Sequence, residues 1–302
     1  MGDMTIIVTG SSGLLGSALT GALRADGVRT VSLVRRKPRG PDESFWDPAK
    51  GILDPAALAG ATAVVHLAGA GIGDRRWNDE VRRELVRSRV EGTATLVRAL
   101  TGLGRDRPEA LLSGSAIGFY GDTGDREVDE TSPPGEGFLA REVVVPWEAE
   151  TVPAEEAGMR VARLRTGLVL SAGGGMLARI LPVFKLGLGA PLGSGRQYWS
   201  WIAIDDWVSA VRRVLDDPGL SGPVNLTAPE PVTNAEFTRA LGRALSRPVM
   251  PVAVPAFALR TALGEFAREG VLTGQRVIPR RLLEAGHTFR HIRLGDALTA
   301  LL

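Results

Sequence analysis

The sequence predicts an α/β protein whose main part is a doubly wound parallel sheet. The first 34 residues read as a strand, a glycine-rich turn, a helix and a second strand. A helical crossover between consecutive strands makes those strands parallel. Further along the chain, short apolar runs alternate with longer helix-like stretches. This alternation is typical of a sheet that is covered by helices on both faces.

Apolar runs, and the residues that interrupt them, place the individual elements. Strands are expected at 4–9, 29–34, 61–68, 110–113 and 161–164, and helices after Gly16 to about residue 25, at 78–100 and at 139–157. Pro146 and Pro153 fall inside the last of these helices, and proline removes a backbone donor from a helix interior. The spacing predicts a helix over 139–157, although the two prolines argue against it.

A change in composition near residue 170 predicts a second, smaller region, because glycine and proline become frequent there. We expect a first domain over residues 1–170, with a return segment near 200–230, and a smaller mixed lobe over residues 171–302. Within the lobe, Thr233 and Glu236 have the spacing of a capping box and predict a helix through Leu245. Asp205 and Asp206 are expected to cap a helix over 207–215.

Composition excludes several classes of protein. The 302 residues contain no cysteine and only three histidines, so disulfides, thiolate metal sites and histidine-rich metal sites are not expected. The 36 basic and 34 acidic residues are interspersed, which argues against a nucleic-acid partner. No apolar run reaches the ~18 residues that a membrane helix needs. The segment Met1 to Met4 lacks the basic flank of a signal peptide. We expect a cytoplasmic protein without a membrane partner.

The turn after the first strand has the residue types of a dinucleotide-binding loop. It lies between a strand and a helix and reads Gly10-Ser11-Ser12-Gly13-Leu14-Leu15-Gly16. The glycines allow close backbone approach, and the free N–H groups of the helix N-terminus can bind a pyrophosphate. The spacing differs by one residue from G-x-G-x-x-G, so a glycine turn without a ligand is the alternative. The flanking strand and helix favour binding.

The residues after the second strand indicate which dinucleotide is bound. An NAD site usually has an acid there that holds the ribose 2′-hydroxyl. This sequence instead reads Val34-Arg35-Arg36-Lys37. Arginine binds phosphate with two parallel hydrogen bonds, so Arg35 and Arg36 favour the 2′-phosphate of NADP. A solvated basic loop is the alternative.

Several further motifs occur in order along nearly the whole chain. They are His66-Leu67-Ala68-Gly69, Arg75-Arg76-Trp77, Ser113 to Asp122, Leu164 to Leu170 and Gly274 to Gly286. Together with the glycine-rich loop they resemble the extended short-chain dehydrogenase/reductase superfamily, and within it the NAD(P)-dependent epimerase/dehydratase-like subfamily. The resemblance implies a Rossmann-type domain with cofactor contacts from Leu67, Ala68, Gly69, Glu84, Arg89, Arg165 and Leu168. A local helix ion pair is the alternative for Glu84 and Arg89.

The catalytic pair of that superfamily, a tyrosine followed four residues later by a lysine, is missing from this chain. Gly124 stands four residues after Tyr120, and Ile202 stands four residues after Tyr198. Where the resemblance places the pair, this sequence has Phe138 and Glu142. A phenol with a pKa of ~10 needs a nearby cation to exchange protons near neutrality. Ser115 and Tyr120 remain as catalytic candidates, because they follow the strand expected to border the nicotinamide. A turn hydroxyl and a packed aromatic ring are the structural alternatives.

Two functions follow from these observations. One is an NADP-dependent oxidoreductase or epimerase that acts on a small carbonyl, alcohol or nucleotide-linked sugar. The other is a non-catalytic NADPH-binding sensor or regulatory module. The retained Ser115 and Tyr120 favour the enzyme, and the missing pair favours the sensor. The sequence identifies neither the small-molecule substrate nor the direction of the reaction, and it is compatible with a homodimer.

Overall fold

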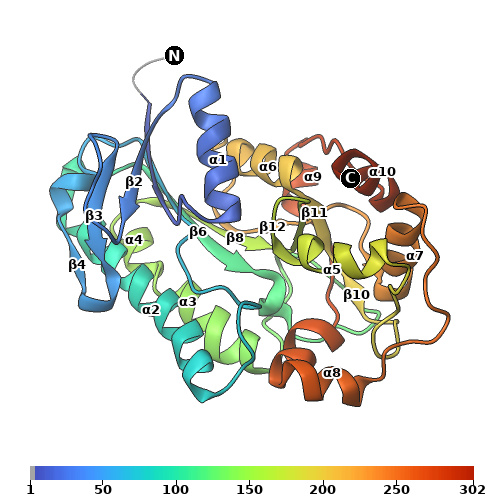
Figure 1. The fold of residues 1–302 in the computed structure, drawn as a ribbon. Coiled ribbons are helices and arrows are strands. Elements are labelled where there is room, and N and C mark those ends of the chain that lie inside the picture. The colour runs from blue at the N-terminus through green and yellow to red at the C-terminus, as the bar shows by residue number, and fades with distance from the viewer. Residues whose placement is uncertain (1–3) are drawn as a thin grey trace.

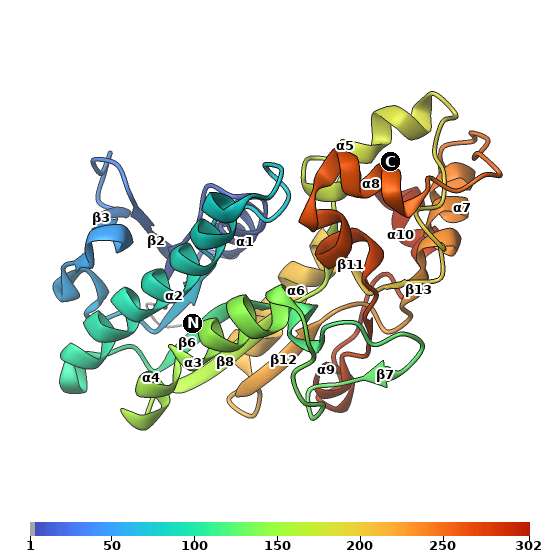
Figure 2. The ribbon, with the colours of Figure 1, turned by 90° about the horizontal axis from the view of Figure 1, so that it is seen from below.

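The computed structural model describes residues 4–302. Residues 1–3, which include most of the segment considered for a signal peptide, lie outside the described residues. Figures 1 and 2 show a central sheet between layers of helices, with a second group of helices beside it. In the view from below, α1 and α2 lie on one side and α5 and α8 on the other.

The central sheet has eight strands in the order β12-β8-β6-β5-β1-β2-β3-β4. Strand β1 (Thr5–Thr9) lies in its interior and pairs in parallel with β2 (Arg29–Val34) and β5 (Ala63–His66). The remaining strands are β3 (Glu43–Asp47), β4 (Ile52–Leu53), β6 (Ala110–Ala116), β8 (Arg160–Thr166) and β12 (Gly222–Leu226). Only β3 and β4 pair antiparallel within this sheet. The predicted doubly wound parallel sheet is confirmed.

Both faces of the sheet are buried by helices, as a parallel sheet requires. Successive residues of a strand point to opposite faces, so Ile6 and Val8 pack in one cluster while Ile7 packs in the other. The first cluster is completed by α1 (Leu14–Ala25) and α6 (Ile204–Asp216). The second is completed by α2 (Asp79–Gly102), and α4 (Val152–Glu156) contributes Ala154.

The helix predicted over 139–157 is divided into three shorter elements, so that prediction was wrong in its continuity. A π-helical segment, η5 (Leu139–Val144), leads into α3 (Val145–Ala149), and α4 follows after a turn. Pro146 and Pro153 each stand in the first turn of α3 and α4. A proline is tolerated there because its missing N–H would have no intrahelical partner.

The second group of elements joins the sheet through short strand pairs. The strands are β7 (Glu127–Val128) with β14 (Arg276–Val277), β9 (Leu168–Leu170) with β11 (Trp201–Ala203), and β10 (Tyr198–Trp199) with β13 (Val232–Thr233). The helices are α5 (Gly175–Lys185), α7 (Asn234–Ala244), α8 (Ala256–Leu263), α9 (Arg280–Glu284) and α10 (Leu294–Leu301).

Short helical segments occur in both parts of the molecule. They are η1 (Pro48–Lys50), η2 (Pro55–Leu58), η3 (Gly104–Asp106), η4 (Ile117–Tyr120) and η6 (Ala267–Leu272).

The predicted capping box opens α7. The Thr233 hydroxyl accepts the Glu236 N–H at 3.3 Å, and the Glu236 carboxylate accepts the Thr233 N–H at 2.8 Å. This helix packs against α10, and the two share a buried cluster that includes Phe237 and Leu298. A local signal therefore starts the helix, and contacts with the end of the chain complete its packing.

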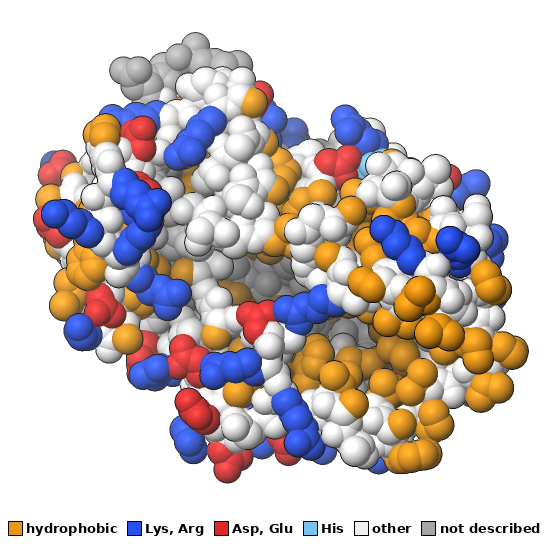
Figure 3. All heavy atoms as spheres, in the orientation of Figure 1, with side chains coloured by type: hydrophobic (Ala, Val, Ile, Leu, Met, Phe, Trp, Pro, Cys, Tyr) orange, Lys and Arg blue, Asp and Glu red, His pale blue; other side chains and the backbone are white. Residues whose placement is uncertain are grey.

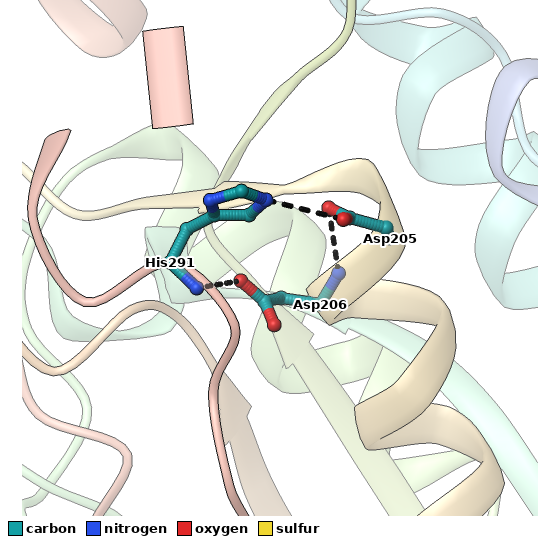
Figure 4. Close-up of side chains that lie close together, drawn as sticks. All are labelled: Asp205, Asp206 and His291. Atoms are coloured by element: carbon teal, nitrogen blue, oxygen red, sulfur yellow. Dashed lines mark hydrogen bonds and ion pairs between the residues drawn. The ribbon is translucent and has the colours of Figure 1, made fainter. Parts of the chain in front are cut away.

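Asp205 and Asp206 do not cap a helix, and that prediction was wrong. Helix α6 begins at Ile204, three residues before the predicted start, so both carboxylates stand in its first turn. The Asp206 carboxylate accepts the backbone N–H groups of Arg290 at 2.7 Å and His291 at 2.9 Å. Asp205 lies 3.2 Å from the His291 ring (Figure 4). The two carboxylates therefore fasten the C-terminal segment to α6.

No helix within residues 4–302 combines the length and apolar character needed to cross a lipid bilayer.

Candidate cofactor-binding site

The glycine-rich loop and the segment after β5 are held together by one hydroxyl. Thr9, the last residue of β1, accepts hydrogen bonds from the amide groups of Leu67 and Ala68, both at 3.1 Å. A Cβ atom on Gly10 would lie 2.8 Å from the Leu67 backbone. The structure thus brings together the predicted loop over 10–16 and the predicted segment over 67–69 at the carboxyl ends of the strands.

The His66 side chain holds the Thr9 hydroxyl in place. Its Nδ1 lies 2.7 Å from the Thr9 hydroxyl oxygen, and its Nε2 lies 3.1 Å from that of Thr93. Because Thr9 already accepts two amide protons, its own proton is donated to Nδ1. The Nε2 proton is then donated to Thr93. Burial lowers the pKa of His66 to about 4, so the ring is neutral at pH 7 and positions the loop.

The three glycines of the loop are present for different reasons. Gly10 has a φ of +68°, and a Cβ atom on Gly16 would overlap the Gly10 carbonyl. Both are therefore required by the fold. Gly13 has a φ of −78°, and its Cβ would meet only the Gly10 carbonyl oxygen, at 3.4 Å. The fold itself would accept a side chain at residue 13.

The open space at Gly13 lies at the start of α1, where no side chain caps the helix. The first N–H groups of a helix have no intrahelical partners, and the helix dipole favours an anion beside them. Ser11, Leu14 and Leu15 are half-buried around the turn, and Ser12 is exposed. An uncapped helix start with a glycine in front of it fits the pyrophosphate of a dinucleotide.

The two predicted phosphate-binding arginines differ in their surroundings, although both are exposed at the end of β2. The Arg36 guanidinium donates two hydrogen bonds to the Glu43 carboxylate, at 2.7 and 2.5 Å. Within residues 4–302, Arg35 makes no hydrogen bond or ion pair. Arg35 is therefore the one of the two whose guanidinium is free to meet a phosphate.

Glu84 and Arg89 do not pair with each other. The Glu84 carboxylate lies 2.5 Å from Arg87, its neighbour one turn along α2. Arg89 donates to the carbonyl groups of Leu85 at 3.1 Å and Ala70 at 3.0 Å, and burial lowers its pKa to about 10. Arg89 therefore fixes the end of the segment after β5, while Glu84 is half-buried and pairs with Arg87.

A buried ion pair connects Arg165 with Glu148, a residue that the sequence analysis did not single out. The Arg165 Nε and Nη2 atoms donate to the two Glu148 carboxylate oxygens, each at 2.9 Å. The hydroxyl of Ser115 donates to the same carboxylate at 2.6 Å. Glu148 follows an apolar stretch that includes Val143, Val144 and Trp147, and this position was the available signal in the sequence.

Tyr120 extends this network and is almost fully buried, with 1% of its surface exposed. Its hydroxyl accepts from Arg165 Nη1 at 3.0 Å and donates to the Asn225 side-chain oxygen at 2.7 Å. Burial raises the pKa of Tyr120 to about 12. The structure thus brings Ser115, Tyr120 and Arg165 together, but as an internal network. The catalytic role of Tyr120 and Ser115 stays a prediction.

A cluster of aromatic rings occupies the place where the resemblance puts the missing tyrosine. Phe138 is buried, its ring centroid is 5.5 Å from that of Trp77, and the Arg82 guanidinium lies 4.3 Å above it. Four residues later, Glu142 lies 3.5 Å from Arg82. Residues 138 and 142 therefore provide neither the tyrosine nor the lysine of the superfamily's catalytic pair.

Residues 70–78, here called the strap, follow β5 of the central sheet and contact α5 of the second group of elements. Asp74 of the strap lies 2.6 Å from Arg179 of α5, which also donates to the Gly73 carbonyl. Figure 3 shows that this face is hollowed between the two sides, with apolar side chains gathered near α5 and α8. Leu168 of β9 packs in the cluster that contains Leu177 of α5. The strap and α5 therefore border the region in front of the glycine-rich loop.

The strand order, the glycine-rich loop after β1 and the basic residues after β2 define a dinucleotide-binding protein of the short-chain dehydrogenase/reductase type. The model of the NAD dependent epimerase/dehydratase family matches residues 6–226, and the chain belongs to this family. A domain of unknown function, DUF1731, matches residues 254–301.

Relatives match over almost the whole chain. An epimerase family protein of Mycobacterium tuberculosis is 50% identical over 99% of this chain and 97% of its own length. The crystal structure of human epimerase family protein SDR39U1 with NADPH superposes with a TM-score of 0.87, at 34% identity and 99% coverage of both chains. A nucleoside-diphosphate sugar epimerase from Corynebacterium glutamicum gives 0.81 at 37% identity, covering 99% of this chain and 58% of that one.

The low pKa of His66 predicts a specific loss of stability in acid. Between pH 6.5 and pH 4 the unfolded state binds a proton that the folded state excludes, so the His66 contribution is present above pH 6.5 and lost as the pH falls. The loss at pH 5 is about 2 kcal/mol. Denaturant unfolding at pH 7 and pH 5 should show a smaller difference for His66→Gln than for the unchanged protein. Equal differences would contradict this assignment.

The network around Tyr120 predicts that Tyr120→Phe is destabilising, because Arg165 and Asn225 each lose a buried partner. The expected cost is about 1–3 kcal/mol in the free energy of unfolding. Tyr198→Phe is the matched control, since the Tyr198 hydroxyl makes no hydrogen bond within residues 4–302, and it should stay within about 0.5 kcal/mol. A general acid would also lose roughly 10²-fold in turnover per folded molecule, whereas a structural hydroxyl would leave that turnover nearly unchanged.

Proposed function

We propose that this protein is an NADP-dependent oxidoreductase or epimerase of the extended short-chain dehydrogenase type. Its substrate would be a small carbonyl, alcohol or nucleotide-linked sugar. The observation that carries the NADP preference is the free, exposed Arg35 at the end of β2, where an NAD site would have an acid. The structure of the human relative with NADPH supports the proposal.

The residues present fit a dinucleotide. The uncapped start of α1 and the open space at Gly13 would hold the pyrophosphate, and Arg35 would bind the 2′-phosphate. The segment Leu67 to Gly69 would border the adenosine, with Glu84, Arg89 and Leu168 farther along the cofactor. When bound, NADP(H) supplies hydride transfer, and the task of this chain is to hold and orient it.

Proton transfer in this proposal does not use the tyrosine–lysine pair of the superfamily. The Tyr120 hydroxyl is buried between Arg165 and Asn225, and Phe138 carries no proton. Ser115 donates its proton to Glu148, so its oxygen could only accept a hydrogen bond from a ligand. Water in the open region would exchange the proton.

The second candidate is an NADPH-binding sensor that does not turn over. The observation that favours it is the burial of Tyr120, because a fixed hydroxyl with a pKa of about 12 is a poor proton donor at neutral pH. Native mass spectrometry of the freshly purified protein, followed by assays on carbonyl and sugar-nucleotide panels, separates the two functions. If the protein retains NADPH but catalyses no reduction or epimerisation, the sensor function would be favoured over the enzyme function. The same mass measurement reports whether the chain forms a homodimer.

The glycine analysis predicts that Gly13→Val abolishes dinucleotide binding without unfolding the protein. A Cβ atom at residue 13 meets only one backbone atom, and a valine side chain there would occupy the space in front of α1. Titration of NADPH against tryptophan fluorescence should show no saturable binding, and thermal unfolding should change little. Gly16→Val is the comparison, since it should lose the fold as well as the cofactor. Normal NADPH affinity in Gly13→Val would disprove the pyrophosphate site.

The free guanidinium of Arg35 predicts that Arg35→Ala lowers NADPH affinity by about tenfold, or 1.4 kcal/mol. The affinity for NADH should not change, because NADH has no 2′-phosphate. Arg105→Ala is the control, since Arg105 is also exposed but precedes β6, whereas Arg35 follows β2, so the two lie at opposite ends of parallel strands. The test measures the dissociation constants of NADPH and NADH for the unchanged protein, Arg35→Ala and Arg105→Ala. Equal affinities of the unchanged protein for NADPH and NADH would defeat the NADP preference.

A further inference from the structure

The turn between β2 and β3, here called the basic loop, spans residues 35–42 and concentrates positive charge. Arg35, Arg36, Lys37 and Arg39 are all exposed. Within residues 4–302, the side chains of Arg35, Lys37 and Arg39 make no hydrogen bond or ion pair. Three cationic side chains are therefore available to a ligand on one short loop.

One carboxylate organises this loop. Glu43, the first residue of β3, accepts both Arg36 hydrogen bonds and also the backbone N–H of Arg39 at 2.7 Å. Its side chain is 22% exposed, against 43% for Arg36. The hydrogen bonds from Arg36 lower the pKa of Glu43 to about 2, so the carboxylate is charged throughout the neutral range.

Glu43 is itself anchored to the sheet. It pairs with Ser32 in the parallel register of β2 and β3, and the Ser32 N–H donates to the Asp42 carbonyl at 2.9 Å. The Glu43 N–H donates to the Gly40 carbonyl at 3.2 Å. The carboxylate is thus a fixed point from which the loop is held at two places, Arg36 and the amide of Arg39.

We propose that Glu43 is a positioning residue for cofactor choice. It acts through Arg36 and the Arg39 amide to hold the basic loop in the form that binds the 2′-phosphate of NADP(H). This inference rests on the proposed NADP preference. It assigns the direct phosphate contact to the free cations of the loop, with Arg35 first, and a structural task to Arg36.

Removing the Glu43 charge has opposite expected effects on NADPH affinity, depending on whether Glu43 acts as a nearby charge or as a positioning residue. Removing a negative charge near a phosphate strengthens its binding by reducing repulsion. Removing a carboxylate that orders the loop weakens binding, because the loop must then be ordered when the cofactor binds. The sign of the change in NADPH affinity therefore distinguishes a positioning residue from a nearby charge.

The test measures dissociation constants of Glu43→Gln for NADPH and NADH by isothermal titration calorimetry. We expect NADPH affinity to fall by about fivefold or more, as a loss of about 1 kcal/mol implies, with NADH affinity unchanged. Arg36→Gln should have the same effect. The double variant should be no worse than either single variant, since both changes remove one interaction.

Asp42→Asn is the matched control. It removes the adjacent negative charge, but Asp42 pairs with Arg29 of β2, at 3.6 Å, and with none of the basic-loop side chains. NADPH affinity should stay the same or rise slightly in this variant.

Two results would overturn the inference. Unchanged or higher NADPH affinity in Glu43→Gln would show that Glu43 acts as a simple charge or not at all. An unchanged protein without any preference for NADPH would remove both the inference and the NADP proposal, and that comparison is made before any variant. Unchanged NADH affinity in Glu43→Gln reports that the fold is intact.

Discussion

The buried ion pair between Arg165 and Glu148 is the constraint on which the edge of the sheet depends. Moving a charge from water into a protein interior costs several kcal/mol unless its partners are complete. Arg165 comes from β8 and Glu148 from α3, and the pair is completed by Ser115 of β6 and Tyr120 after it. Phe119 adds a ring 3.4 Å from the guanidinium carbon. Any shift of one element would leave a charge unmatched, so these elements hold each other in register.

The same network fixes the position of Tyr120. Its hydroxyl accepts a hydrogen bond from Arg165 and donates one to Asn225 of β12. Nearby, Phe138 and Arg82 form a cation–π contact. The strand ends therefore have the means of binding a dinucleotide, and the buried polar and aromatic groups beside them stabilise the fold.

Local patterns were sufficient to predict some elements of the fold, although not β3 and β4. The strand over 29–34 and the capping box of Thr233 and Glu236 depend on neighbours within a few residues, and the structure has both. Glu148 could not be paired with Arg165 from the sequence, because the two are 17 residues apart and meet through packing. Asp206 was assigned to a helix cap because its partner, the amide of His291, lies 85 residues away. Burial of Tyr120 likewise depends on Asn225, which no local pattern indicates.

The hydrogen bonds from the amides of Arg290 and His291 to the Asp206 carboxylate bear on how such chains evolve. The family model ends at residue 226 and the next begins at residue 254, which suggests two separable modules. The contacts cross that boundary, since Asn225 donates to the Ile278 carbonyl and α10 packs on α7. A fragment ending at residue 226 would lose the partners of Asp206 and Asn225 and so expose buried polar groups. The two segments therefore constrain each other's evolution, because each supplies partners for buried polar groups of the other.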